Sequence, residues 1–201
     1  MVWAPPFERR SRAWLSRIEE RLRAIESREP ERFKLLSQDD TFASVLISAT
    51  QAAFRARHEE KLQLLGAAVE QSASGTQISA DLQVLFVRFI DELTVSHVRL
   101  LRCLAEHPEE LRTASSYETL RTLFTQSTQA APTPEEFLLM CNDLTARVLL
   151  RISSSVQEFR DVLEVDYVIT EGSSDDPLVR VTDLGRTFLS FVDAGATPRV
   201  A

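Results

Sequence analysis

The sequence predicts a mainly α protein, with an N-terminal helical bundle packed on a C-terminal winged-helix-like domain that contains a small β-hairpin. Three observations support this fold class. The 201 residues include only 5 glycines and many alanine, leucine, arginine and glutamate residues, a composition that favours helix. Apolar residues recur at helical spacing along most of the chain. From Thr94 onward the predicted order is helix, helix, helix, strand, wing-like hairpin and helix.

The N-terminal half contains three predicted helices. Residues 8–28 form the first, which Glu29-Pro30 ends because a residue before proline avoids the α region. A longer helix begins near Asp39 or Asp40, continues through Val69 and stops at Ala73-Ser-Gly75. A third begins near Ser79. Their apolar positions are Trp14, Ile18, Leu22 and Ile25, then Phe42, Val45, Leu46, Ala49, Ala53, Leu62, Leu65 and Val69, then Leu82, Leu85, Phe86, Phe89 and Ile90.

The C-terminal half begins where the apolar pattern restarts, so we expect two domains, 1–92 and 93–201, the second with a frayed tail after Gly195. Thr94 precedes a helix that stops before Pro108, and a helix from Ser116 to about Phe124 leads into a loop over 125–132. Thr133-Pro-Glu-Glu136 predicts a capping box at the next helix. Strand-like residues follow at 149–153 and 178–182, and the segment between them contains a third strand-like run over 164–170 and turn residues over 172–177.

The stretch VTDLGRTFLSFV, residues 181–192, turns from the last strand into the closing helix. We expect Phe188, Leu189 and Val192 to pin that helix onto the core. Gly185 is expected to relieve crowding near the corner.

Bulk properties favour a cytoplasmic protein without a bound metal or cofactor. The net charge of −7 opposes extensive nucleic-acid binding, which needs a basic face. No window is apolar enough to cross a bilayer, and the N-terminus lacks a secretory signal. Cys103 and Cys141 lie in apolar helical patterns, where a free thiol behaves as a small buried hydrophobe, rather than at a disulfide or metal spacing.

No motif of a known catalytic chemistry is present. Phosphate-binding and dinucleotide-binding glycine loops and the GxSxG nucleophile turn are missing from the sequence. His58, His97 and His107 have no partner at a metal-ligand spacing, and we interpret His97 as a capping or surface residue and His58-Glu-Glu-Lys61 as a solvated face. We therefore predict no enzyme, while a site composed of residues distant in sequence remains an alternative.

The charges around the predicted recognition helix argue against a DNA reader. Residues 134–147 carry Glu135, Glu136 and Asp143 against the single Arg147, and acidic residues also outnumber basic ones around the hairpin. Such a surface would repel the phosphate backbone. The alternative function is a winged-helix transcriptional regulator that binds DNA weakly through Arg147, Arg151 and Arg180.

The first helix concentrates basic residues, and two interpretations stay open for it. It is either a solvent face with internal salt bridges, or a docking helix for an acidic partner or a membrane surface with Trp14 on its apolar side. The candidate interaction residues on this helix are Arg9, Arg10, Trp14, Arg17 and Arg21; its other arginines are Arg12, Arg23 and Arg28.

Several runs resemble a group of poorly characterised bacterial helical proteins. They are 42–53 with Glu59-Glu-Lys-Leu62, the "DELT..H.R.L" run at 91–101, and the "TxLGRxFLxF" element at 182–191. A more distant similarity is to the Abi-alpha (abortive infection) domain. Across residues 8–192 the resemblance implies the fold and a place in a phage-defence or stress pathway, without an activity.

Two departures from that group matter. Val148 stands where the relatives carry glycine, so the third helix of the C-terminal half is expected to run on by a turn. The relatives also carry an apolar, Gly-rich segment upstream of the run that corresponds to 5–10, and we expect any membrane contact to use such a segment. The function predicted from the sequence is a non-enzymatic protein-interaction or regulatory module that binds a protein partner or itself.

Overall fold

The described residues fall into two compact units. The structure is a computed structural model that describes residues 6–114, 116–152 and 179–193. Unit 1 comprises Met1–Val95 and Thr187–Ala201, and unit 2 comprises Ser96–Arg186. The first border lies three residues from the division expected at 92/93, but Thr187 and the described residues after it group with unit 1. The expected domains 1–92 and 93–201 stay a prediction.

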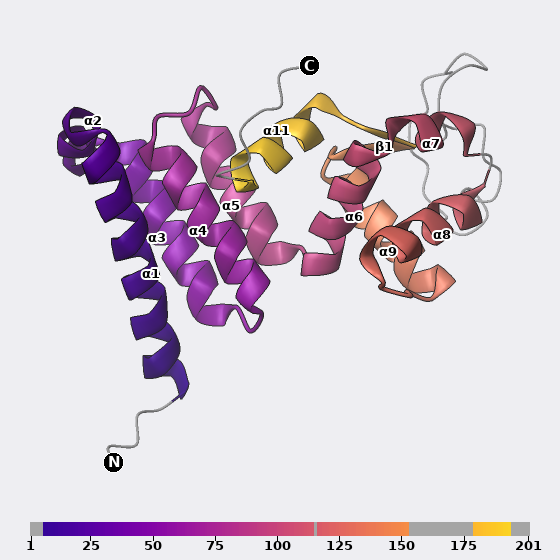
Figure 1. Cartoon of the computed structure of the whole chain (residues 1–201), viewed down its shortest axis with the longest axis horizontal. Coiled ribbons are helices and arrows are strands. Elements are labelled where there is room, and N and C mark those ends of the chain that lie inside the picture. The colour runs from indigo at the N-terminus through magenta and orange to yellow at the C-terminus, as the bar shows by residue number, and fades with distance from the viewer. Residues whose placement is uncertain (1–5, 115, 153–178, 194–201) are drawn as a thin grey trace. The chain divides into compact units, whose positions relative to one another are not determined.

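Unit 1 is a helical bundle. Figure 1 shows α1, α3, α4 and α5 side by side; α3 packs against α1, α4 and α5, and α4 also packs against α1 and α5. The elements are α1 (Pro6–Arg28), α2 (Pro30–Leu35), the short 3₁₀ helix η1 (Leu36–Gln38), α3 (Asp40–Arg55), α4 (Glu59–Ala73) and α5 (Ala80–Glu92).

The single long helix predicted from Asp39 or Asp40 to the stop after Val69 is wrong, because the structure has two helices there. α3 ends at Arg55, and Ala56 is extended with φ −66° and ψ 133°. The sequence contains the reason. Ala53 and Leu62 are nine residues apart, about two and a half turns, so one continuous helix would place them on opposite faces. The turn at 56–58 returns the apolar residues of α4 to the bundle core, where Leu65 and Ala68 are fully buried.

Aromatic side chains close unit 1 around the end of helix α11 (Asp183–Val192). The Phe86 ring lies 5.4 Å from Phe188 and 5.7 Å from Phe191, centroid to centroid, and Phe89 lies 6.2 Å from Phe188. Leu189 and Val192 are buried as well. The expectation that this helix packs on a core is therefore confirmed, and that core belongs to the N-terminal bundle.

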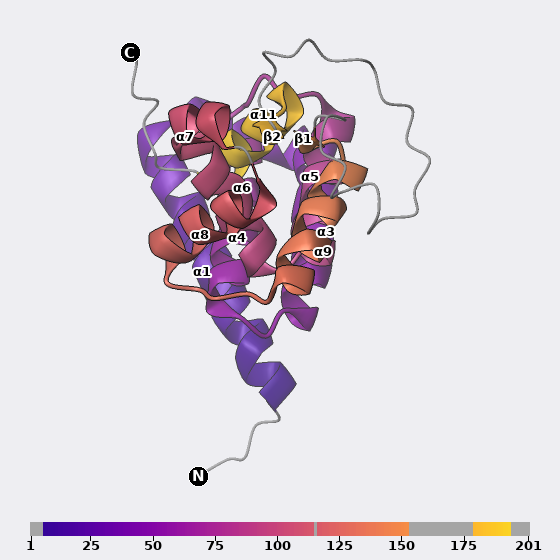
Figure 2. The same cartoon turned by 90° about the vertical axis from the view of Figure 1, so that its right-hand side faces the viewer.

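Unit 2 consists of short helices and two strands, and it faces the viewer in Figure 2. Its elements are α6 (Val95–Glu106), α7 (Pro108–Thr113), α8 (Tyr117–Thr128), α9 (Pro134–Ala146), β1 (Leu150–Ile152), β2 (Val179–Val181) and the first turn of α11. The Phe137 ring of α9 meets the Tyr117 ring in a T-shaped contact at 5.0 Å and the Phe124 ring in a tilted contact at 5.9 Å, centroid to centroid. This cluster holds α8 against α9.

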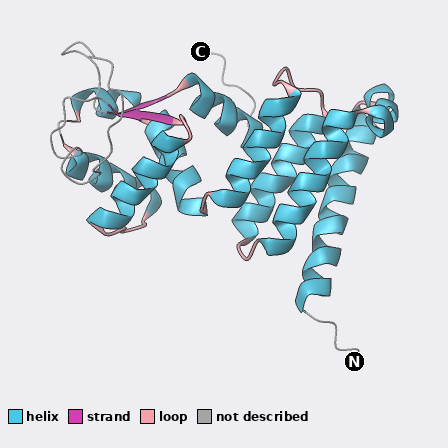
Figure 3. Ribbon diagram, turned by 180° about the vertical axis from the view of Figure 1, so that it is seen from behind, coloured by secondary structure: helices cyan, strands magenta, loops and turns pink. Residues whose placement is uncertain are grey.

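Several local predictions in unit 2 are confirmed. The Thr133 side chain accepts from the Glu136 amide and the Glu136 carboxylate accepts from the Thr133 amide, which completes the capping box. Figure 3 shows the two strands, which pair antiparallel within the predicted spans. The loop expected over 125–132 is wrong in part, since α8 continues to Thr128 and ends at left-handed Gln129. α7 was not predicted.

The architecture is thus mainly helical with one small two-stranded antiparallel sheet in the described part of the chain. Three further predictions lie outside the described residues: the strand over 164–170, the turn over 172–177 and the frayed tail after Gly195. No helix among the described residues is long and apolar enough to span a bilayer.

Candidate interaction surfaces

The candidate residues of α1 are mostly engaged inside unit 1. Trp14 is 1% exposed, and its indole Nε1 donates to Thr50 Oγ1 at 3.1 Å. Arg17 pairs with Glu59 at 2.5 Å and Arg21 pairs with Glu70. Both pairs join α1 to α4 within unit 1.

The docking interpretation needs correction at Trp14, because its apolar stripe is the stripe that α1 buries in the bundle. Arg10 is exposed on the first turns of α1. Arg9 also lies on α1, and its side chain is outside what the structure describes. An interaction role for Arg9 and Arg10 stays a prediction.

The end of α9 departs from the expectation that the helix runs on by a turn. α9 ends at Ala146, and Val148 itself adopts the left-handed conformation with φ +58°. The amide of Val148 donates to Thr145 O and the amide of Leu149 donates to Leu144 O, both at 2.9 Å. This pair of bonds defines a Schellman motif, with Val148 at the position that usually carries glycine.

The left-handed backbone of Val148 is energetically unfavourable, and contacts of the neighbouring residues stabilise it. Left-handed backbone costs an L-residue about 1–2 kcal/mol, and a β-branched residue is an outlier there. Leu144 and Leu149 are fully buried, which supplies the apolar contact of the motif. The Thr182 hydroxyl donates to Val148 O at 2.6 Å and accepts from the Gly185 amide at 2.9 Å. Thr182 thus ties the end of α9 to the start of α11. The Val148 side chain remains 61% exposed.

The hairpin brings two of the predicted residues together. Arg151 of β1 is the direct cross-strand partner of Arg180 of β2, and both side chains are exposed. The flanking positions Leu150 and Val181 are buried. Alternation along the strands therefore places both guanidinium groups on the outer face of the sheet.

Arg147 takes a different position from the other two arginines. It follows the last residue of α9, is half-buried, and donates from Nη1 to Asp143 O at 3.0 Å. Its Nη1 also lies 3.9 Å from Asp143 Oδ1. Arg147 therefore belongs mainly to the α9 terminus, and the structure does not group it with the outer face of Arg151 and Arg180.

The outer face of α9 combines carboxylates with an exposed leucine. Leu139 is 59% exposed. Glu135 lies one turn before it, Glu136 lies beside Glu135, and both are exposed. Ala146, two turns after Leu139, is exposed on the same face. This face offers apolar area next to negative charge.

His97 is a residue whose environment the sequence did not predict correctly. It is 6% exposed rather than on the surface, and its Nε2 lies 3.1 Å from Asp143 Oδ2. The contact joins α6 to α9. Its spacing of 46 residues has no local signature, although Val98, Leu101 and Leu104 share the buried face of the same helix.

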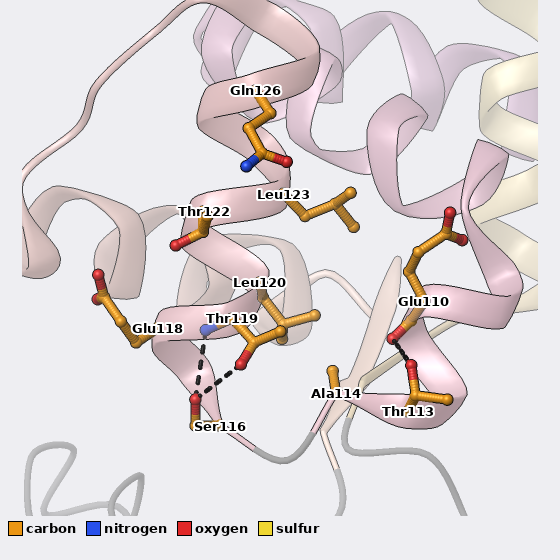
Figure 4. A pocket seen from close by; sticks show the side chains of 10 residues that line it. All are labelled: Glu110, Thr113, Ala114, Ser116, Glu118, Thr119, Leu120, Thr122, Leu123 and Gln126. Atoms are coloured by element: carbon orange, nitrogen blue, oxygen red, sulfur yellow. Dashed lines mark hydrogen bonds between the residues drawn. The ribbon is translucent and has the colours of Figure 1, made fainter.

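A hollow of about 420 Å³ lies between α7 and α8 (Figure 4). Threonine and serine hydroxyls, two carboxylates and a short apolar floor line it. Ser116 caps α8 by accepting from the Thr119 amide, and Glu118 pairs with Arg121. The Arg121 guanidinium lowers the pKa of the Glu118 carboxyl. Among the described residues that line it, none is a histidine, cysteine or lysine.

The two cysteines are free and buried, as predicted. Burial raises the pKa of the Cys141 thiol to about 12, and burial also raises the pKa of Cys103. Such thiols are poor nucleophiles, since the thiolate is the reactive form. Among the described residues, no group of three or more histidine, cysteine, aspartate or glutamate side chains is placed to hold a metal ion.

Comparison with known proteins adds no assignment. No protein-family profile, curated protein sequence or solved structure matches the chain.

Proposed function

We propose that this chain is a non-enzymatic protein-interaction module of the winged-helix type, in which α9 contacts a partner protein or a second copy. One observation carries the proposal. On the helix that a DNA-binding winged helix would place in the major groove, Leu139 is 59% exposed beside Glu135 and Glu136. Apolar area beside carboxylates suits a contact with a protein. The carboxylates would repel the phosphates of DNA. Burial of the exposed leucine in a protein interface would be favourable, because it removes apolar surface from water.

The pathway is a further part of this proposal. The resemblance to the abortive-infection domain supports a role in bacterial phage defence or a stress response, within the cytoplasm. A phage plating assay on host cells with and without the gene tests it. Equal plating efficiency across a panel of phages, together with equal growth under stress, would remove the pathway and leave the contact role intact.

The contact role is tested by site-specific photocrosslinking in the host cell. A photoreactive phenylalanine derivative at position 139 is expected to yield a discrete crosslinked product, identified by mass spectrometry as a partner or a second copy. Ile47 on α3 is the matched control, because it is also 59% exposed. The product should disappear when untagged wild-type chain competes. No discrete product at 139, or the same products at 47, would refute the contact role.

DNA binding is the second candidate, and the juxtaposition of Arg151 and Arg180 favours it. Two arginines on the wing of a winged helix suit contacts to adjacent phosphates. An electrophoretic shift assay at low salt with random genomic duplexes decides the matter. A shift at micromolar protein that is lost when both arginines become glutamate would support the regulator, and no shift would eliminate it.

A further inference from the structure

We infer that a second copy of this chain docks antiparallel on the solvent-facing side of α1, through a surface hereafter called the α1 outer stripe. The stripe consists of Glu8, Arg12, Leu15, Ser16, Glu19 and Arg23. This surface lies in unit 1 and is independent of the α9 contact proposed above. The position of the stripe, the order of its charges and the exposure of its central leucine together lead to a two-fold dimer.

The α1 outer stripe lies on the side of α1 that faces away from the bundle. From Glu8 to Arg23 its members follow one another at spacings of three or four residues, with Ser16 beside Leu15, so they share one face of the helix. All of them are exposed. The residues that α1 buries lie on its other side: Trp14, Ile18 and Ile25. Figures 1 and 3 show α1 at the edge of the bundle. A second helix can therefore approach the stripe along its length of about 22 Å.

The charges of the stripe are arranged symmetrically, with opposite signs, about a midpoint directly after Leu15. Arg12 and Glu19 lie at equal distances on either side of this midpoint, and so do Glu8 and Arg23. A two-fold axis through the midpoint would place Arg12 opposite the partner's Glu19, and Glu8 opposite the partner's Arg23. Each of these pairs occurs twice by symmetry, so every charge of the stripe meets an opposite charge.

This charge order selects an antiparallel second copy over other occupants. In a parallel pair each residue would meet its own counterpart, so every charge of the stripe would face a like charge. The stripe contains two arginines and two glutamates. It is therefore electrically balanced and attracts neither a uniformly acidic peptide nor the phosphates of DNA or of a membrane. A partner with the same sequence of charges in the reverse direction satisfies all of them.

The charges of the stripe are already paired within α1, and docking does not require them to be free. Arg12 Nη2 lies 3.3 Å from Glu8 Oε2, and Arg23 Nη2 lies 2.6 Å from Glu19 Oε1. These side chains are all at least 51% exposed, so water competes for the pairs and they stabilise α1 only slightly. A guanidinium group has several N–H donors and can bind its own glutamate and the partner's glutamate together. The dimer would thus join the separate pairs into a network.

Leu15 supplies the apolar centre of the contact. Its side chain is 55% exposed in the single chain. Because it lies beside the midpoint, a two-fold axis there would bring the leucines of both copies together and remove their apolar surface from water. An apolar centre with a charged rim is the usual arrangement of a protein interface. One helix face is smaller than a standard interface, so we expect a weak and reversible dimer.

The central test uses two half-swapped variants, which keep the net charge of the chain and an ion pair at each position of the pairs within α1. One variant combines Glu8→Arg with Arg12→Glu, and the other combines Glu19→Arg with Arg23→Glu. In a dimer of either variant alone, like charges would face each other across the axis. In a mixed dimer of the two variants, every charge again faces an opposite charge.

Analytical ultracentrifugation at low salt measures these dimers. The wild-type chain should dimerise at roughly tens to hundreds of micromolar protein. Each half-swapped variant alone should dimerise about tenfold more weakly or less, and the equimolar mixture should dimerise like the wild-type chain. Neither a change in net charge nor a parallel pairing of helices produces this pattern. Circular dichroism of each variant shows whether the fold persists.

Single substitutions locate the contact independently of the charges. Leu15→Ala should weaken dimerisation about threefold or more. Leu35→Ala is the matched control, because Leu35 is 57% exposed on α2 of the same unit, and it should have little effect. Under mild oxidation, Ser16→Cys beside the axis should give a disulfide-linked dimer. Ser27→Cys, which is exposed on α1 outside the stripe, should not. The two native cysteines are buried.

The remaining outcomes each contradict one contact. Absence of a wild-type dimer up to about 1 mM protein, or a dimer that neither half-swapped variant weakens, would overturn the inference. Folded half-swapped variants that do not dimerise when mixed would do the same. A dimer that is lost in Leu139→Ala and unaffected by the half-swaps would assign self-association to α9 and reject the α1 outer stripe. A dimer that responds to the half-swaps, without a crosslink at position 139, would keep the stripe and reject the α9 contact.

Discussion

The backbone of Gly185 lies directly against the carbonyl group of Leu149. A β-carbon at position 185 would stand 2.3 Å from Leu149 O and 3.0 Å from Val181 Cγ1. The same carbonyl oxygen accepts from the Thr182 amide at 3.1 Å. The start of α11 therefore approaches Leu149, the residue before β1, so closely that only glycine fits, which is the crowding that the sequence predicts at this corner.

Gly185→Ala should destabilise the chain by about 1–3 kcal/mol in urea unfolding, because rigid backbone atoms would have to move. The direction of this stability change is informative, because replacing glycine with alanine inside a helix normally stabilises the protein by up to about 1 kcal/mol. Gly66→Ala is the control. Its β-carbon would meet the Arg21 side chain at 3.0 Å, and a flexible side chain can move. Equal stability of the two variants would contradict the close approach at Leu149.

Val148→Gly should raise the free energy of unfolding by about 1 kcal/mol. Relief of the left-handed strain outweighs the added backbone entropy of glycine in the unfolded chain, and the exposed side chain contributes little burial. Ile47→Gly is the control with a similar exposed fraction, at 59%. It lies inside α3 and should destabilise by about 1 kcal/mol. A destabilised Val148→Gly variant would show that Val148 is not strained.

Local signals predicted much of this fold, because the interactions that they describe are local. The Thr133 capping box, the end of α1 before Glu29-Pro30 and the two strands depend on neighbours within a few residues. The break between α3 and α4 was missed although the nine-residue gap from Ala53 to Leu62 indicates it. Arginine, glutamate and lysine residues, which favour helix, occupy most of the positions between them and gave an uninterrupted helical composition.

The candidate surfaces were less predictable, because they depend on contacts between distant residues. The sequence identifies Trp14 as part of an apolar stripe but cannot say which partner covers it, and Thr50 of α3 proves to be its hydrogen-bond partner. The pairing of Arg151 with Arg180 requires the strand register. The His97 contact with Asp143 has no sequence signal beyond helical spacing, since both residues are polar and lie on different helices.

Cys141 should resist alkylation in the native chain at pH 9 and react quickly once urea unfolds it. Burial holds the pKa of its thiol near 12, against an ordinary value of 9.0. The folded state therefore retains a proton that the unfolded state loses between these values. The resulting contribution to stability is present below pH 9 and declines as the pH rises toward 12.

Iodoacetamide labelling followed by mass spectrometry of the peptides measures this prediction, and Cys103 provides an internal comparison because burial raises the pKa of its thiol as well. Fast native labelling of Cys141 at pH 9 would mean that α9 opens readily.

Trp14 should be shielded from solvent in the native chain. The sequence contains two tryptophans, so Trp3→Phe leaves Trp14 as the single indole reporter. Its 1% exposure and its hydrogen bond to Thr50 predict blue-shifted emission and acrylamide quenching several-fold slower than in urea. Thr50→Val should destabilise unit 1 by about 1 kcal/mol, because a buried indole N–H loses its acceptor. The docking interpretation of α1 predicts the opposite result, a red-shifted and readily quenched Trp14 that becomes protected only when a partner or an anionic vesicle is added. Native emission that matches the urea-unfolded chain would therefore contradict the buried position of Trp14 and support the docking role.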